Sequence, residues 1–211
     1  MGASGGFPID IVLFGMIAAF LVLRLRSVLG RRQGFEHPPE SAQSQTAQPE
    51  PAAAPPVTAD PASPTGSALV RMQLADPSFQ PARFLEGAHA AFRLIVEAFA
   101  AGNRDRLHPL LSDDTYHAFE AAIAARETAG ETQRTEIRAI PSATIEQADL
   151  RASTANITVR FVSDQINVTL GSDGQPAAGA DAVTEITDLW TFERSLGSTD
   201  PTWRLIAARS A

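Results

Sequence analysis

The sequence predicts an α+β domain in which helices pack on a curved antiparallel sheet, preceded by an N-terminal transmembrane helix and a disordered linker. Three observations lead to this prediction: an uncharged apolar run near the N-terminus, a proline-rich stretch behind it, and a change of hydrophobic period from about 3.6 to 2 after Gly130. We assign residues 1–34 to a membrane anchor with a basic collar, residues 35–78 to the linker and residues 79–211 to the folded domain.

The anchor begins with thirteen residues, 11–23, that carry no charge, and its apolar character continues to Leu29. The extended run approaches the about 20 residues that a helix needs to cross a bilayer. No basic residue precedes the run and no A-x-A pattern follows it, which favours an anchor over a signal peptide or a buried core helix. We expect lipid contacts from the apolar side chains of Ile11, Val12, Leu13, Phe14, Ile17, Phe20, Leu21 and Leu23.

The basic collar is the group of arginines that ends the apolar run: Arg24, Arg26, Arg31 and Arg32. Each can add about 1 kcal/mol of attraction to anionic lipid headgroups. Because basic residues mark the cytoplasmic side of a span, we expect a single-pass protein whose C-terminal domain is cytoplasmic.

The linker consists mostly of Ala, Pro, Gln, Ser, Thr and Glu between Glu40 and Ser67. Such a composition has too little apolar surface to offset the entropy of ordering, which predicts disorder. Residues 68–74 can form two turns of amphipathic helix, lying on the membrane or, as we favour, on the domain.

Helical spacing of apolar residues predicts a long helix over 81–101, a shorter one over 104–111 and a third over 115–129. Ser112 and its acidic neighbours suit the start of the third helix, and Gly130 suits its end.

Beyond Gly130 the apolar residues alternate, which predicts half-buried strands. The alternation is clear at 157–161 and at 166–170, and it returns at 186–192 and at 203–207; residues 145–150 are a possible further strand. Residues 171–174 (GSDG) have the composition of a turn.

Composition excludes several kinds of chemistry for this chain of 211 residues. Cysteine is absent and all 17 basic residues are arginine, so disulfides, thiolate metal sites and lysine Schiff bases are impossible. The formal net charge of −7 argues against a nucleic-acid partner. We therefore predict no cofactor and no metal.

Several sequence strings resemble the Tim44-like family: Asp10 to Gly34, Asp76 to Phe92, Ile157 to Ile166, and Asp188 to Arg194 (DLWTFER), with Asp200 to Trp203 near the end. Within that family the chain is most similar to alphaproteobacterial TimA-type adaptors, relatives of the mitochondrial inner-membrane translocase subunit. The order of elements also resembles the cone of the nuclear-transport-factor-two-like superfamily, which encloses an apolar pocket.

This resemblance implies a non-enzymatic adaptor of the bacterial inner membrane, acting in protein translocation or membrane-protein assembly. Its partners would be the lipid bilayer and client or assembly-partner proteins, and tethering is the role carried over, rather than chaperone recruitment. A scaffold of a secretion system is an alternative that would place the domain on the outer side of the membrane.

Seven aromatic residues are candidates for lining a pocket or groove, although most of them should serve the core. They are Phe84, Phe92, Phe99, Phe161, Trp190, Phe192 and Trp203.

Asp188 is a candidate pocket acid because strict alternation puts it on the same face as Ile186 and Trp190. In an open cone it could abstract a proton next to a carbonyl, which gives the alternative function of a membrane-tethered small-molecule binder or isomerase. The structural interpretation is that Asp188 bonds a backbone amide or an arginine such as Arg194.

Overall fold

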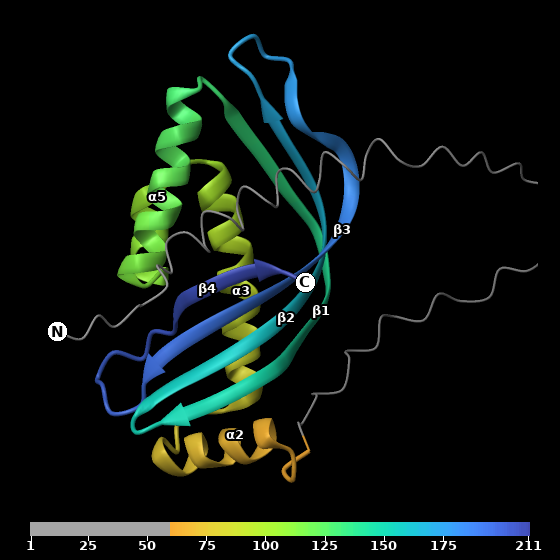
Figure 1. The fold of residues 1–211 in the computed structure, drawn as a ribbon. Coiled ribbons are helices and arrows are strands. Elements are labelled where there is room, and N and C mark those ends of the chain that lie inside the picture. The colour runs from red at the N-terminus through yellow and green to blue at the C-terminus, as the bar shows by residue number, and fades with distance from the viewer. Residues whose placement is uncertain (1–59) are drawn as a thin grey trace, which may run out of the picture.

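The computed structural model describes residues 60–211, and Figure 1 shows their arrangement. The predicted anchor, the collar arginines and the linker up to residue 59 lie outside these described residues. The helices are α2 (Pro64–Ala75), α3 (Pro81–Ala100), α4 (Arg104–Leu107), the 3-10 helix η1 (His108–Leu110) and α5 (Asp113–Thr128). The strands are β1 (Thr132–Arg151), β2 (Thr154–Leu170), β3 (Pro176–Ser195) and β4 (Arg204–Ser210). The α+β prediction is confirmed, since helices pack on an antiparallel sheet of four strands.

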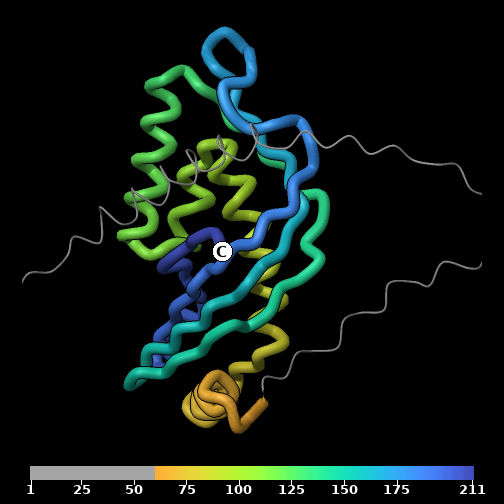
Figure 2. Tube along the Cα trace, turned by 45° about the vertical axis from the view of Figure 1, so that its right-hand side comes forward, coloured from red at the N-terminus to blue at the C-terminus, as the bar shows by residue number. Residues whose placement is uncertain are grey.

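The sheet is a meander in which each strand pairs with its neighbour in sequence, in the order β1-β2-β3-β4. Figures 1 and 2 show that α3 and α5 lie on one side of the curving strands, while α2 lies at one end of the sheet. All the helices precede the strands along the chain. They form one layer and the sheet forms the other, with a single core between the two layers.

The strands are longer than the alternation predicts. The segments at 157–161 and 166–170 form one strand, β2, and β1 begins at Thr132 rather than near residue 145. Register shifts in β1 between Ile137 and Ala139, and again between Ala139 and Ser142, break the two-residue period. A bulge turns successive side chains away from strict alternation, and this hid the first half of β1 from the sequence prediction.

Helix α2 lies within the range 35–78 that we assigned to the linker, and it includes the two helical turns expected at 68–74, which pack on the domain. Its buried side chains Ala68, Leu69 and Met72 face the sheet, and its contacts are with β1. Ser63 caps the helix by accepting a hydrogen bond from the Gly66 amide at 3.0 Å. A helix of twelve residues is marginal alone, and packing against a distant strand stabilises it.

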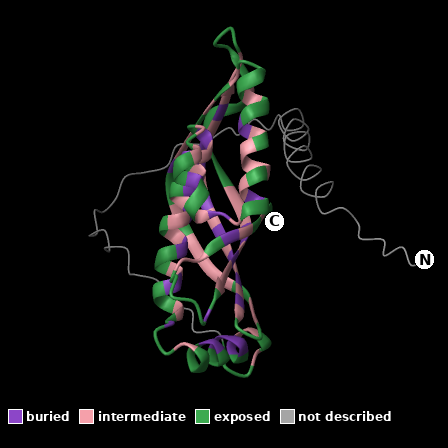
Figure 3. Cartoon of the chain, turned by 90° about the vertical axis from the view of Figure 1, so that its left-hand side faces the viewer, coloured by how far each residue is buried: buried purple, intermediate pink, exposed green. Residues whose placement is uncertain are grey.

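The core centres on α3, whose apolar stripe faces the inner side of the sheet. Phe92 is fully buried and stacks on Phe161 of β2 at 4.4 Å between ring centroids. Trp190 of β3 lies 4.6 Å from Phe92. Figure 3 shows buried residues concentrated between the helices and the sheet. The interior of the expected cone is therefore filled by aromatic rings at this level.

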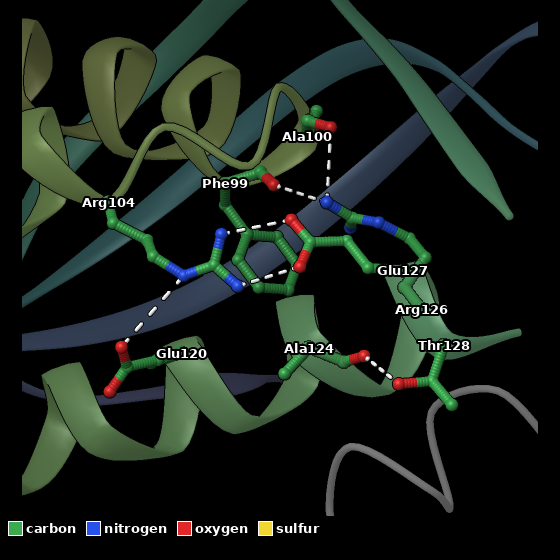
Figure 4. Close-up of polar contacts among 8 residues, drawn as sticks. All are labelled: Phe99, Ala100, Arg104, Glu120, Ala124, Arg126, Glu127 and Thr128. Atoms are coloured by element: carbon green, nitrogen blue, oxygen red, sulfur yellow. Dashed lines mark hydrogen bonds and ion pairs between the residues drawn. The ribbon is translucent and has the colours of Figure 1, made fainter. Parts of the chain in front are cut away.

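The ends of α3 and α5 are joined through Arg126, which Figure 4 shows in detail. Its guanidinium donates hydrogen bonds to the carbonyl oxygens of Phe99 at 2.8 Å and Ala100 at 3.2 Å, and it also binds the Gln133 side chain. The cation lies 5.2 Å from the centre of the Phe99 ring. Arg126 thus supplies a donor to the Ala100 carbonyl at the end of α3 and a second donor, beside the Gly102 amide, to the Phe99 carbonyl. Its positive charge is favourable at the negative C-terminal end of the helix dipole.

We expect the substitution Arg126→Met to lower the free energy of unfolding by about 1–2 kcal/mol, because it removes the donor of the Ala100 carbonyl and one of the two donors of the Phe99 carbonyl. The matched control is Arg104→Met. Arg104 of α4 pairs with Glu127 of α5 at the protein surface, where solvent screens the interaction, so its loss should be smaller. Urea unfolding of the two variants followed by tryptophan fluorescence measures the difference. Equal losses would contradict the role assigned to Arg126.

Candidate functional site

An apolar groove of about 290 Å³ lies beside the first half of α3, and we call it the α3 groove. Its walls come from segments far apart in sequence: residues 78–80, α3, η1, the end of β3 and the loop before β4. The lining side chains used below are Phe79, Phe84, Leu110, Phe192 and Trp203, with Gly87 on α3 and the arginines Arg83 and Arg194.

Aromatic rings form the floor of the α3 groove. Trp203 lies 4.7 Å from Phe84 and 5.8 Å from Phe79, measured between ring centroids. Phe84 meets Phe192 edge to face at 6.0 Å. Phe79, Phe84 and Phe192 are buried, whereas Trp203 is half-buried and presents an apolar surface to the groove. Such a floor suits a large apolar side chain.

The space in the groove exists because α3 has small residues on this face. Gly87 is exposed, and a Cβ atom built on it would meet no other atom within 4 Å. A glycine inside a helix costs about 1 kcal/mol relative to alanine. Ala88 and Ala91 follow on the same wall. The residues of α3 therefore leave this part of the interface with the sheet unfilled, in contrast to Phe92 one step further along the helix.

One end of the groove is held by an ion pair between Arg194 of β3 and Asp76, which precedes α3. The Arg194 Nη2 and Asp76 Oδ2 atoms are 2.5 Å apart, and the side chains are only 12% and 16% exposed. Hydrogen bonds from the Ser78 hydroxyl and amide, together with the Arg194 charge, hold the pKa of Asp76 below its usual range. The Arg194 guanidinium also lies 6.0 Å from the Trp203 ring. This pair fixes the segment between α2 and α3 against the sheet.

A second hollow, of about 310 Å³, shares Arg194 with the groove and has a polar lining. Asp113, Glu193 and Asp200 face it together with Arg204 and several hydroxyl groups. The Asp200 carboxylate accepts a hydrogen bond from the Thr202 amide and pairs with Arg204. The two hollows therefore meet at Arg194, and Asp200 in the polar hollow already has partners within the chain.

The structure divides the seven aromatic candidates into two groups. Phe84, Phe192 and Trp203 line the α3 groove. Phe92, Phe161 and Trp190 pack together in the core, and Phe99 packs against Phe119 of α5 at 4.9 Å. Arg83, Gly87 and Leu110 also line the groove, although the sequence pattern did not indicate them. The run of small residues on one face of α3 was the signal available for Gly87.

Asp188 lies on the inner face of the sheet, where its register partners are Phe161 of β2 and Ser210 of β4. Its carboxylate accepts a hydrogen bond from the Ser210 hydroxyl at 3.1 Å. Burial raises the pKa of Asp188 to about 6, partly offset by that hydrogen bond. The side chain lines neither the α3 groove nor the polar hollow. The Asp188 carboxylate thus bonds a hydroxyl, whereas the predicted partner Arg194 pairs with Asp76.

The polar side chains on the neighbouring part of β2 form hydrogen bonds with one another and with β1. Gln165 donates to Ser163 at 2.8 Å and accepts from Asn167 at 3.2 Å. Thr135 of β1 donates to Asn167 at 2.6 Å and accepts from Gln133. Ser163 and Gln165 are buried. This chain of hydrogen bonds satisfies buried polar groups, which is a structural role.

Within residues 60–211 there is no group of three or more acidic or histidine side chains placed to hold a metal ion. None of the helices in this range combines the length and the hydropathy that crossing a bilayer requires.

Comparison with known proteins gives one family match. The family model described as Tim44-like domain matches residues 65–210. No curated protein matches. Among solved structures, the intermembrane space region of the chloroplast protein ARC6 is 11% identical with a TM-score of 0.46, covering 63% of this chain and 97% of that one. A periplasmic fragment of TraM is 14% identical with a TM-score of 0.35, covering 59% and 96%. A conserved protein from Planctomyces limnophilus is 19% identical with a TM-score of 0.33, covering 57% and 89%.

Asp188→Asn should flatten the pH dependence of stability. A carboxyl whose pKa rises from its usual value near 4 to about 6 on folding binds its proton more tightly in the folded state. The wild-type free energy of unfolding therefore falls as pH rises from about 4 to 6 and stays lower above that range. A full shift of this size is worth at most about 3 kcal/mol, and partial exposure reduces it to about 1–2 kcal/mol.

The measurement is urea unfolding of wild type and Asp188→Asn at pH values from 4 to 8. We expect the two proteins to be similar at pH 4 and the variant to be more stable at pH 7. Parallel curves across this range would show that Asp188 titrates as an ordinary exposed carboxyl.

Proposed function

Because the chain belongs to the Tim44-like domain family, we propose that it is a non-enzymatic adaptor that binds partner proteins through the α3 groove. The observation that carries this proposal is an open, aromatic-floored groove on a domain whose deeper core is filled. In this proposal the partner inserts a large apolar side chain over Phe84 and Trp203. Exposed apolar surface rimmed by polar residues is typical of protein-interaction sites.

The second part of the proposal is that the adaptor is tethered to the bacterial inner membrane, with its domain on the cytoplasmic side. The apolar run at residues 11–29 and the collar of four arginines support this part. A tether restricts the search for partners to the membrane surface, which suits protein translocation or membrane-protein assembly. Client and assembly-partner proteins and the lipid bilayer are the partners in this proposal.

Catalysis by Asp188 is the alternative function. The raised pKa of its carboxyl favours a proton-transfer role, since catalytic acids and bases often have shifted pKa values. Its position is against that role, because Asp188 lies outside both the groove and the polar hollow, and its neighbours on β2 bond to one another. The adaptor proposal accounts for the groove as well as for the filled core.

The tether predicts that the protein stays in the membrane fraction after alkaline carbonate extraction, because a spanning helix is released only when the bilayer is dissolved. A fluorescent reporter fused after Ala211 should be active, and a phosphatase reporter that requires the periplasm should be inactive at the same position. Release of the intact protein by carbonate would contradict membrane tethering. Phosphatase activity would favour the secretion-system scaffold.

If partners bind in the groove, Gly87→Leu should abolish partner binding while leaving the fold intact, because the new side chain fills open space. The matched control is Gly87→Ala, which changes the same position, raises helix propensity and leaves most of the groove open. Proximity labelling from the domain in cells measures both. We expect the neighbours of wild type and Gly87→Ala to agree and those of Gly87→Leu to fall at least about fivefold, the size of a change of about 1 kcal/mol in binding. An identical set of neighbours in all three would rule out the groove as the docking site.

A further inference from the structure

The charges at the α3 groove specify the kind of residue that should enter it. Arg83 and Arg194 line the groove, and no carboxylate is among its lining residues. Arg194 is paired with Asp76, but Arg83 is exposed and makes no ion pair within the described part of the chain. A free guanidinium beside an aromatic floor favours a large apolar side chain that is followed or preceded by a carboxylate.

The chain itself contains such a pair. Phe35 is directly followed by Glu36, and it is the one aromatic residue in the sequence between the predicted anchor, which ends at residue 34, and Asp60. We propose that Phe35 docks on the floor of the α3 groove and that Glu36 pairs with Arg83, so that the chain occupies its own docking site. This inference rests on the proposed function, since it takes the groove to be the site where partners bind.

The length of the connection fits this docking. Twenty-four residues separate Phe35 from Asp60, and a coil of that length has a root-mean-square span of about 25–30 Å. From Asp60 the chain runs along α2, twelve residues or about 18 Å, to the groove wall at Ser78. A flexible chain of this length would therefore be long enough to place Phe35 at the groove.

A connection of this kind gives the segment an effective concentration of about 1 mM at the groove. A contact with a dissociation constant of about 100 μM would then occupy the groove in about nine molecules out of ten. Weak recognition is thus sufficient within one chain, while a partner in solution must bind more tightly to displace the segment.

Docking would also set the height of the domain above the membrane. Phe35 is three residues beyond Arg32, the last arginine of the basic collar. A docked Phe35 would hold the α3 groove next to the headgroups, and a partner that displaces it would release the domain to the full reach of the linker. The groove would then couple partner binding to the distance from the bilayer.

The absence of native cysteine permits a direct test by disulfide formation in the full chain, carried out in membranes of expressing cells. One cysteine replaces Gln80, which is exposed at the groove and makes no capping hydrogen bond. The other replaces His37, beside Glu36. The matched control pairs Gln80→Cys with Ser44→Cys, because Ser44 is nearer to Asp60 along the chain and a linker that only searches would bring it to the groove at least as often.

We expect the His37→Cys pair to form an intramolecular disulfide at least about five times faster than the Ser44→Cys pair under the same mild oxidant. Adding Phe35→Ala should reduce the rate to that of the control, and Glu36→Gln should lower it by a smaller factor. Non-reducing gels and mass spectrometry of the linked peptides distinguish a bond within one chain from a bond between two chains.

Equal rates for the two cysteine pairs, or a rate that Phe35→Ala leaves unchanged, would overturn the self-docking proposal. A disulfide that forms only between two chains would overturn it in favour of docking by a second copy. Its failure is separable from failure of the adaptor proposal: if partner labelling still depends on Gly87→Leu while the disulfide rates are equal, the groove binds partners and Phe35 does not occupy it.

Discussion

The contact between Phe92 of α3 and the rings of Phe161 and Trp190 determines how the helix layer meets the sheet. These rings lie within 4.4 and 4.6 Å of Phe92 and close the interior of the domain at the middle of α3. Burial of a side chain of this size is worth about 2–3 kcal/mol, and the three rings also fix the spacing of the two layers. This contact therefore sets how far the remaining side chains of α3 lie from the sheet.

The α3 groove is a consequence of that spacing. Phe92 sets the distance between helix and sheet, and the glycine and alanines on the preceding turns are too small to fill it. The ion pair between Arg194 and Asp76 then draws the segment before α3 onto β3 and encloses the end of the space. A groove built in this way is rigid on its sheet side, because Phe192 and Arg194 belong to the paired part of β3. Rigid walls reduce the entropy that a bound segment must overcome.

The polar groups near β2 and those at the α3 groove differ in whether they have partners within the chain. The polar side chains of β2 hydrogen-bond to one another, and the Asp188 carboxylate accepts a hydrogen bond from the Ser210 hydroxyl. At the groove, by contrast, Arg83 remains exposed next to apolar surface. In the proposed adaptor, the apolar area would supply affinity and the cation would restrict which residues fit, as at many protein-interaction sites. The adaptor proposal follows from this contrast.

The sequence by itself determined the class of the fold, the course of α3 and α5, and the inward side of the alternating strands. These features depend on periodic burial and on local capping by residues such as Ser112, which neighbours in sequence decide. Only the tertiary structure decided that α2 extends from Pro64 to Ala75, that β1 starts at Thr132, and that three of the seven aromatic residues line a groove. Packing against β1 stabilises α2, bulges break the period of β1, and the groove combines α3 with a loop more than a hundred residues away. Each depends on contacts between distant segments, which local sequence patterns do not encode.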